Sequence, residues 1–286
     1  MNNTAQTFWQ PTLLIKLFIA MHFLFLMSVL FMPHLWQWVL AVLFLSHIVV
    51  ACVGLWPRSH WLGPNWTKLP TAAANRNEIA LTIDDGPAPL ITAHVLNLLD
   101  EYNAKATFFC IGTNALQYPE LCREIVRRGH AIENHTQQHR HYFSLQGLRG
   151  LTREIEAAQK TLLNLTGVRP QFFRAPAGLR NPFLEPVLNR LGLRLVSWTA
   201  RGFDTKTRNA EKVTKKLLSA LYPGAILLLH DGNAAVTKTN IPIILAVLPT
   251  LLEEAKKKNL RFVTLKDAAL MPSDNNAMQT AKLHHV

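Results

Sequence analysis

The amino-acid sequence predicts an α/β protein, namely a distorted, incomplete (β/α)7 barrel preceded by an N-terminal two-helix transmembrane hairpin. Beyond residue 77, short apolar runs alternate with amphipathic helical patterns about seven times, which indicates parallel β/α units. The runs are apolar throughout, so the strands are expected to be buried on both faces. Polar residues follow almost every run, as they do around the carboxyl-terminal mouth of a barrel, and this favours a barrel over an open sheet.

The predicted hairpin occupies a stretch from Leu13 to Trp56 in which Lys16 is the only residue with a fixed charge. A break at Met32-Pro33-His34 leaves two apolar segments, 13–31 and 35–55, each about 20 residues or roughly 30 Å of helix, which matches the hydrocarbon core of a bilayer. A buried soluble hairpin is disfavoured because neither segment has a polar face. Tryptophans stand near the predicted ends, where interfacial aromatic residues belong: Trp36, Trp38, Trp56 and Trp61.

Two spans place both ends of the hairpin on one side of the membrane. The loop between the spans has no lysine or arginine, whereas Lys16, Arg58 and Lys68 flank the spans on the other side. The positive-inside rule therefore favours a cytoplasmic main domain, although so few charges leave the side open. We expect four parts: 1–56 the hairpin, 57–76 a linker rich in proline and glycine, 77–270 the main domain, and 271–286 a polar, disordered tail.

The composition is strongly basic. The 286 residues include 30 Lys and Arg against 18 Asp and Glu, a formal net charge of +12. Such a surplus favours attraction to an anionic membrane surface or to phosphorylated substrates. Nucleic acid is not an expected partner, because no Lys/Arg-rich block is interleaved with aromatic residues. The three cysteines have neither a metal-type spacing nor a disulfide framework, and we interpret them as small buried residues.

Within the main domain, apolar periodicity predicts the elements one by one. Strands are expected at 79–83, 106–111, 131–132, 171–174, 193–198, 225–230 and 261–265. Helices are expected at 91–102, 119–128, 151–165, 182–191, 210–221 and 241–258.

The first of these strands ends in two adjacent carboxylates, Asp84 and Asp85, followed by the turn signal Gly86-Pro87. Two acids at the end of a buried strand repel each other and lose hydration, which is tolerable if a cation lies beside them or if one of them takes up a proton. An isolated Asp-Asp-Gly would more simply cap a turn. The polar residues at the ends of later strands favour a functional site instead.

His135 and His139 follow the third predicted strand. Four residues apart, they are predicted to share one face of a helical turn, where they could hold one metal ion. A lone His-x-x-x-His is by default a surface pair. With a carboxylate from another strand it becomes a two-histidine, one-carboxylate set with open coordination positions, which suits zinc or another divalent transition metal acting on water. His141 is an alternative ligand.

Four motifs now stand in order along the chain: Thr-Ile-Asp-Asp-Gly-Pro at 82–87, His-Thr-x-x-His at 135–139, Arg-x-Pro-x-Gly at 174–178 and Leu-x-His at 228–230. In this order and spacing they resemble the polysaccharide deacetylase family, carbohydrate esterase family 4, over roughly residues 78–265. The resemblance implies a metal-dependent hydrolase. It also implies a role for each matched residue: Asp84 as general base, Asp85, His135 and His139 as metal ligands, His230 as general acid, Arg174 as the residue that orients the base, Asp204 as the acid that raises the pKa of His230, and the Ala177 N–H as the oxyanion donor.

The chain departs from the family pattern at three positions. Ile83 replaces an aromatic residue before the acids, a packing change of little consequence. Ala177 and Thr205 stand where the family usually has aromatic residues that stack on sugar rings. We therefore expect the reactive groups to be kept and the substrate cradle to be altered, which argues against a long, flat polymer held by stacking.

We expect the protein to remove an N-acetyl or N-formyl group from an amino sugar that is lipid-linked or part of a cell-envelope glycan. The expected cofactor is Zn²⁺, with Co²⁺, Ni²⁺ or Mn²⁺ as alternatives, and the expected partners are the acylated amino-sugar substrate and membrane lipids. Two other functions remain open: an esterase that acts on O-acetylated glycans, and a non-catalytic membrane protein that binds sugars.

Overall fold

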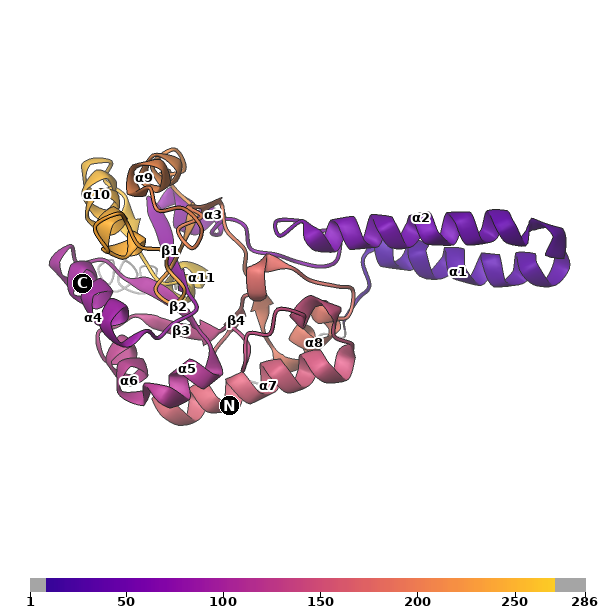
Figure 1. Cartoon of the computed structure of the whole chain (residues 1–286), viewed down its shortest axis with the longest axis horizontal. Coiled ribbons are helices and arrows are strands. Elements are labelled where there is room, and N and C mark those ends of the chain that lie inside the picture. Colours follow the sequence, from indigo (N-terminus) through magenta and orange to yellow (C-terminus); the bar gives the residue numbers. More distant parts are fainter. Residues whose placement is uncertain (1–8, 271–286) are drawn as a thin grey trace, which may run out of the picture.

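The computed structural model describes residues 9–270, so the predicted tail at 271–286 lies outside the described residues. Its centre is an eight-stranded sheet in the order β5-β4-β3-β2-β1-β7-β6, with β8 pairing β1 off this path. Every strand pair is parallel. The sheet curls into a half-barrel, and this confirms the predicted fold class (Figure 1). The strands are β1 (Glu78–Asp84), β2 (Ala106–Cys110), β3 (Ala131–Asn134), β4 (Phe172–Phe173), β5 (Arg194–Leu195), β6 (Ala200–Arg201), β7 (Ile226–His230) and β8 (Arg261–Phe262).

Helices cover the outside of the sheet, namely α4 (Pro89–Glu101), α5 (Gly112–Gln117), α6 (Pro119–Arg127), α7 (Leu148–Thr166), α8 (Leu184–Leu191), α9 (Ala210–Leu218) and α10 (Ile243–Lys257). Two short helices, α3 (Thr71–Asn75) and α11 (Leu265–Ala269), pack instead with the residues of the inner face. Each predicted strand and helix is present, with ends that differ by a few residues. The elements that the sequence did not predict, α3, α5, β6 and α11, have two to six residues, too few for a periodic pattern.

The central strand β1 is buried along its whole length. Ile79, Leu81 and Ile83 point outward and belong to the cluster that includes the buried faces of α4 and α10. Ala80 belongs instead to an inner cluster with Phe109. Because side chains alternate along a strand, Asp84 lies on the inner face, inside the curl of the sheet.

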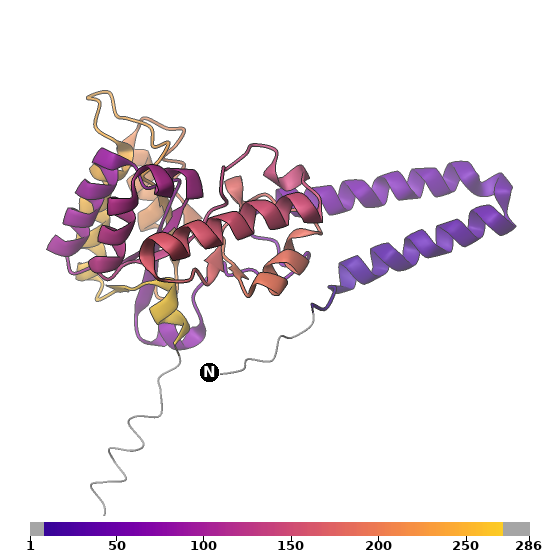
Figure 2. The same ribbon diagram turned by 90° about the horizontal axis from the view of Figure 1, so that it is seen from below.

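The hairpin consists of α1 (Leu13–Phe31) and α2 (Trp36–Leu55), joined by a short turn. The two helices lie side by side and project from the half-barrel (Figures 1 and 2). Both are long and apolar enough to cross a membrane. Large apolar side chains face outward along them, with Phe31 79%, Trp38 73% and Phe44 71% exposed. Within the described residues, no part of the main domain covers these side chains.

Residues 57–76, predicted to be a linker, lie along the half-barrel. The Trp66 N–H donates to the Leu195 carbonyl at 2.9 Å, and the Ser197 N–H donates to the Trp66 carbonyl at 2.8 Å. At the end of α2, the Arg180 N–H donates to the Gly54 carbonyl at 3.1 Å. A Cβ at Gly54 would lie 2.3 Å from the Arg180 carbonyl oxygen, so glycine is required there. These contacts hold the base of the hairpin against the barrel.

Candidate active site

Asp84 ends β1, and its carboxylate is held by Arg174. The Arg174 Nη1 donates to Asp84 Oδ1 at 2.7 Å and to Thr82 Oγ1 at 2.8 Å. Its Nη2 and Nε donate to the carbonyls of Ser197 at 2.7 Å and Val196 at 3.2 Å. The arginine is only 1% exposed, and it therefore points into the half-barrel toward the acid rather than into solvent. Four acceptors hold the guanidinium, and through it the carboxylate, in one orientation.

Asp85, His135 and His139 form a cluster beside this pair. Each offers one ligand atom, and the three atoms lie within 4.8 Å of one another. Asp85 Oδ1 is 3.2 Å from Nε2 of both histidines. His135 Nδ1 lies 2.8 Å from the Arg174 carbonyl oxygen. That carbonyl can only accept, so Nδ1 carries a proton, and Nε2 is the nitrogen that faces Asp85 and would bind a metal ion once deprotonated. The donor set and its spacing fit a divalent transition metal.

The two histidines do not share a helical turn, and that part of the sequence-based prediction was wrong. Strand β3 continues to Asn134, and a loop follows it. Two residues of the loop, Thr136 (φ 67°) and His139 (φ 50°), are left-handed. Asn134 Oδ1 accepts from the Thr136 N–H, and Thr136 Oγ1 accepts from the His139 N–H, each at 2.9 Å. Local side-chain hydrogen bonds of this kind replace helical ones, and they bring both imidazoles to Asp85.

The protonation states around this cluster follow from burial and charge. Burial, and then the charge of His135, lowers the pKa of His139 to about 4. Burial would raise the pKa of Asp85, but the hydrogen bond and charge of His135, with smaller contributions from His230 and His139, hold it below its usual range. At neutral pH, Asp85 is therefore ionised and His139 neutral, as metal ligation requires.

His230 ends β7 and is the register partner of Asp84 on β1. Its Nδ1 lies 2.9 Å from Asp204 Oδ1, and its backbone N–H donates to Asp204 Oδ2 at 2.7 Å. Burial would lower the pKa of His230, but the hydrogen bond and charge of the fully buried Asp204, with the charges of Asp84 and Asp85, raise it. With Nδ1 engaged, Nε2 is the nitrogen left for a substrate.

These groups line one small pocket of about 240 Å³. Ala177 and Thr205, the two positions without the usual aromatic residue, are part of its wall. Ala177 has φ 54° within the turn Pro176–Gly178, and no carbonyl within residues 9–270 accepts from its N–H. The pocket lies below the roughly 300–1,000 Å³ of typical ligand sites, so it admits a small group only.

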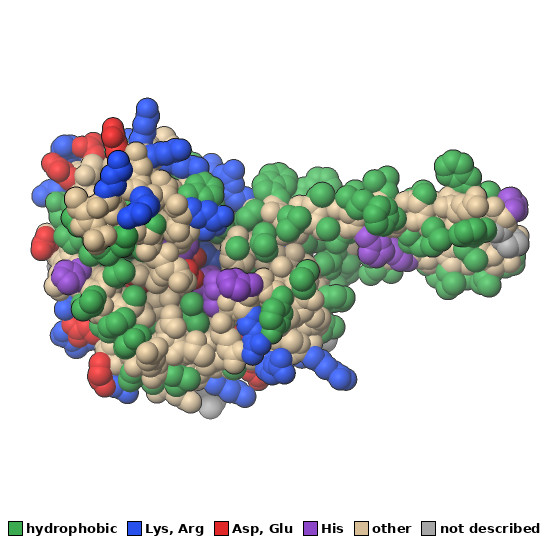
Figure 3. All heavy atoms as spheres, viewed as in Figure 1, with side chains coloured by type: hydrophobic (Ala, Val, Ile, Leu, Met, Phe, Trp, Pro, Cys, Tyr) green, Lys and Arg blue, Asp and Glu red, His purple; other side chains and the backbone are tan. Residues whose placement is uncertain are grey.

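Three further residues touch this pocket without having been predicted. Trp198 and Arg201 line it, and Asn233 Nδ2 donates to Asp85 Oδ2 at 3.3 Å. Their position at the end of a predicted strand or just beyond it was the available signal. His141 also lines the pocket, yet it is not one of the three clustered ligands. Figure 3 shows histidine and acidic side chains in a hollow of the main domain, with lysine and arginine side chains gathered between that hollow and the hairpin.

Comparison with known proteins identifies relatives of this chain. Residues 71–196 match the sequence profile described as polysaccharide deacetylase. A peptidoglycan-N-acetylglucosamine deacetylase of Listeria monocytogenes is 35% identical over 200 residues, covering 70% of this chain and 40% of the relative. The chain thus spans less than half the length of that relative. A chitooligosaccharide deacetylase of Azorhizobium caulinodans is 40% identical over 163 residues, covering 55% of this chain and 75% of the relative.

The fold has solved counterparts as well. The crystal structure of a peptidoglycan N-acetylglucosamine deacetylase is similar with a TM-score of 0.63 and 29% sequence identity, over 71% of this chain and 92% of that one.

Proposed function

Because the chain belongs to the polysaccharide deacetylase family, we propose that it is a metal-dependent hydrolase that removes an N-acetyl, or N-formyl, group from an amino sugar. One observation carries this proposal. A single pocket brings together three candidate metal ligands, a carboxylate that is not among them and an imidazole paired with a buried acid. A decayed, non-catalytic member would be expected to lack some of these groups.

Asp85, His135 and His139 would hold the ion, and zinc is the ion that suits this ligand set best. Cobalt, nickel and manganese are the alternatives. When bound, the ion supplies Lewis acidity, which polarises the acyl carbonyl and acidifies water. The proton transfers of the reaction are carried out by side chains of the protein itself.

Asp84 accepts the proton that water loses as it attacks the acyl carbon. Its Oδ1 is held by Arg174, which leaves Oδ2 to take the proton in a fixed direction. As the acyl oxygen gains negative charge, the Ala177 N–H donates to it. His230 then protonates the leaving nitrogen from Nε2, since an amine departs poorly without a proton. The products are a carboxylic acid and the free amino sugar.

The two neighbouring acids provide the test. Asp84→Asn should leave the metal content unchanged while lowering kcat by about 10²–10⁴-fold, because only proton transfer is lost. Asp85→Asn should lose both metal and activity, because it removes a ligand. Metal content is measured by elemental mass spectrometry and activity by release of acetate from N-acetylated amino sugars. Full activity of Asp84→Asn would overturn the proposal, and His135→Ala serves as the control for metal loss.

A comparison of substrates separates an amidase from an O-acetyl esterase. An alcohol leaves more readily than an amine, so His230→Ala should reduce amide hydrolysis far more than ester hydrolysis. If the wild-type protein cleaves only O-acetyl esters, the activity is that of an esterase built from the same residues.

We further infer that α1 and α2 anchor the protein in a membrane, and that the substrate is a lipid-linked or cell-envelope glycan. The exposed apolar hairpin supports this. The pocket wall supports it as well, because Ala177 and Thr205 stand there in place of aromatic residues that would stack on a long polymer. The charge bias around the spans favours a cytoplasmic catalytic domain. A reporter joined after the last residue of the chain tests the side, because phosphatase activity of the fusion would indicate the opposite, external orientation.

A further inference from the structure

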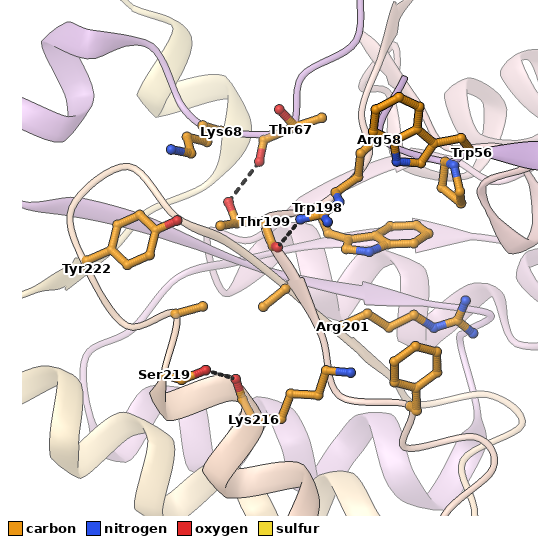
Figure 4. Close-up of a pocket in the computed structure, with 14 residues that line it drawn as sticks. Trp56, Arg58, Thr67, Lys68, Trp198, Thr199, Arg201, Lys216, Ser219 and Tyr222 are labelled. Atoms are coloured by element: carbon orange, nitrogen blue, oxygen red, sulfur yellow. Dashed lines mark hydrogen bonds between the residues drawn. The ribbon is translucent and has the colours of Figure 1, made fainter. Parts of the chain in front are cut away.

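A second cavity, of about 840 Å³, lies between the end of α2 and the pocket that holds Asp84 and His230, which we call the catalytic pocket. Figure 4 shows the residues that line this second cavity. We name it the basic groove. Its walls carry four cationic side chains and no acidic one: Arg58, Lys68, Arg201 and Lys216. Arg58, which follows α2, and Lys216 on α9 lie on opposite sides of the groove, with Thr199 between them.

These cations have no counter-ion of their own, since none of the four forms an ion pair within residues 9–270. They rest instead on neutral groups. Arg58 Nη1 donates to the Thr199 carbonyl at 3.2 Å, and Lys216 Nζ lies 4.1 Å from the centre of the Phe203 ring. The Arg201 guanidinium lies 5.5 Å from the Trp198 ring, and its Nε is buried without an acceptor. Four like charges around one cavity repel, and an anion that bridges them would relieve this repulsion.

The basic groove connects two places that the proposed function needs. At one end it is lined by Trp56 and Pro57, which directly follow α2 and thus lie where a span would leave the bilayer. At the other end it shares Trp198 and Arg201 with the catalytic pocket. A ligand with its tail beside α2 would therefore pass the cations before its head reaches the catalytic residues.

We propose that the basic groove binds the phosphate or diphosphate group that joins the acylated amino sugar to its lipid, with the sugar in the catalytic pocket. This inference rests on the proposed deacetylase function and identifies where the chain would recognise a lipid-linked substrate. Arginine and lysine suit this task because they form charge-assisted hydrogen bonds to phosphate oxygens. The adjacent pocket, with room for a small group only, receives the sugar.

The test compares two synthetic substrates on the full chain, loaded with zinc in a neutral maltoside detergent. Dodecyl N-acetylglucosaminide is neutral, whereas N-acetylglucosaminyl dodecyl diphosphate carries the anion. We expect Lys216→Gln to lower the ratio of kcat/KM for the diphosphate over the neutral substrate by about tenfold, as the loss of one charge-assisted hydrogen bond would. Lys215→Gln is the matched control, because Lys215 is the neighbouring exposed lysine on α9 and does not line the basic groove. It should leave the ratio unchanged.

An unchanged ratio in Lys216→Gln, or the same change in Lys215→Gln, would overturn the proposal. So would an effect that appears only when phosphatidylglycerol is added, because the groove would then bind bulk lipid headgroups. Equilibrium binding of dodecyl diphosphate gives a readout that needs no turnover, and Lys216→Gln should weaken it about tenfold. If the wild-type protein binds dodecyl diphosphate through Lys216 yet cleaves neither substrate, the deacetylase function fails while the groove stands. If it cleaves both with a ratio that Lys216→Gln does not alter, the groove fails while the function stands.

Discussion

Arg174→Met offers the sharpest test of how the site is built, because one side chain holds both the proposed base and the strand ends around it. The substitution removes four hydrogen bonds, to Asp84, Thr82, Val196 and Ser197. It also leaves the Asp84 carboxylate, only 3% exposed, without its cation. Breaking a buried ion pair from one side costs about 3–5 kcal/mol.

That loss of stability predicts a decrease in Tm of roughly 10 °C for a chain of this size, measured by circular dichroism on the zinc-loaded protein in detergent. Catalysis should fall by about 10²-fold or more, because the base is no longer held in the attacking geometry. Arg174→Lys should rescue little, since a single ammonium cannot reproduce the planar fork. The control is Arg149→Met, which alters an exposed arginine on α7 and should change neither quantity.

A double-mutant cycle isolates the pairwise contribution. In Asp84→Asn the carboxylate charge is absent, so adding Arg174→Met should cost about 1–3 kcal/mol less than it costs in the wild-type protein. Additive effects would show that the two side chains do not interact energetically, and a wild-type Tm in Arg174→Met would refute the reasoning altogether.

Three further predictions concern the rest of the site. Asp204→Asn should lower the pKa of His230, because the acid raises it. In the proposed mechanism His230 acts in its protonated form, so the alkaline limb of the kcat/KM profile should move to lower pH. An unmoved limb would contradict this role. Gly232→Ala should weaken zinc binding about tenfold or more, because its Cβ would lie 2.2 Å from the Asp85 carbonyl oxygen, and a zinc titration with wild-type affinity would argue against that constraint. Phenanthroline should abolish activity, and added Zn²⁺ should restore it. The His139→Ala protein should not recover activity at the same zinc concentration, because it lacks one ligand. Activity that survives the chelator would count against a metal cofactor.

The sequence by itself determined the fold class and predicted the residues of the site. Two apolar segments of bilayer length and about seven strand–helix alternations were enough for the architecture, because burial periodicity is a local property of the chain. The motifs around Asp84, His135, Arg174 and His230 named the candidate reactive groups. Parallel strands bring their carboxyl ends to one edge, so the sequence also predicted that these groups would meet.

Only the tertiary structure decided how these groups are held and which of them lie together. Asp84 and Asp85 are neighbours in the sequence, yet the first is held by Arg174 on the inner face of the sheet and the second turns at φ 72° toward the histidines. The loop that carries His139 could not be predicted from four-residue spacing, because side-chain hydrogen bonds replace a helix there. The basic groove could not be predicted from the sequence either. Its cations come from separate segments of the chain, and only folding brings them together between α2 and the catalytic pocket.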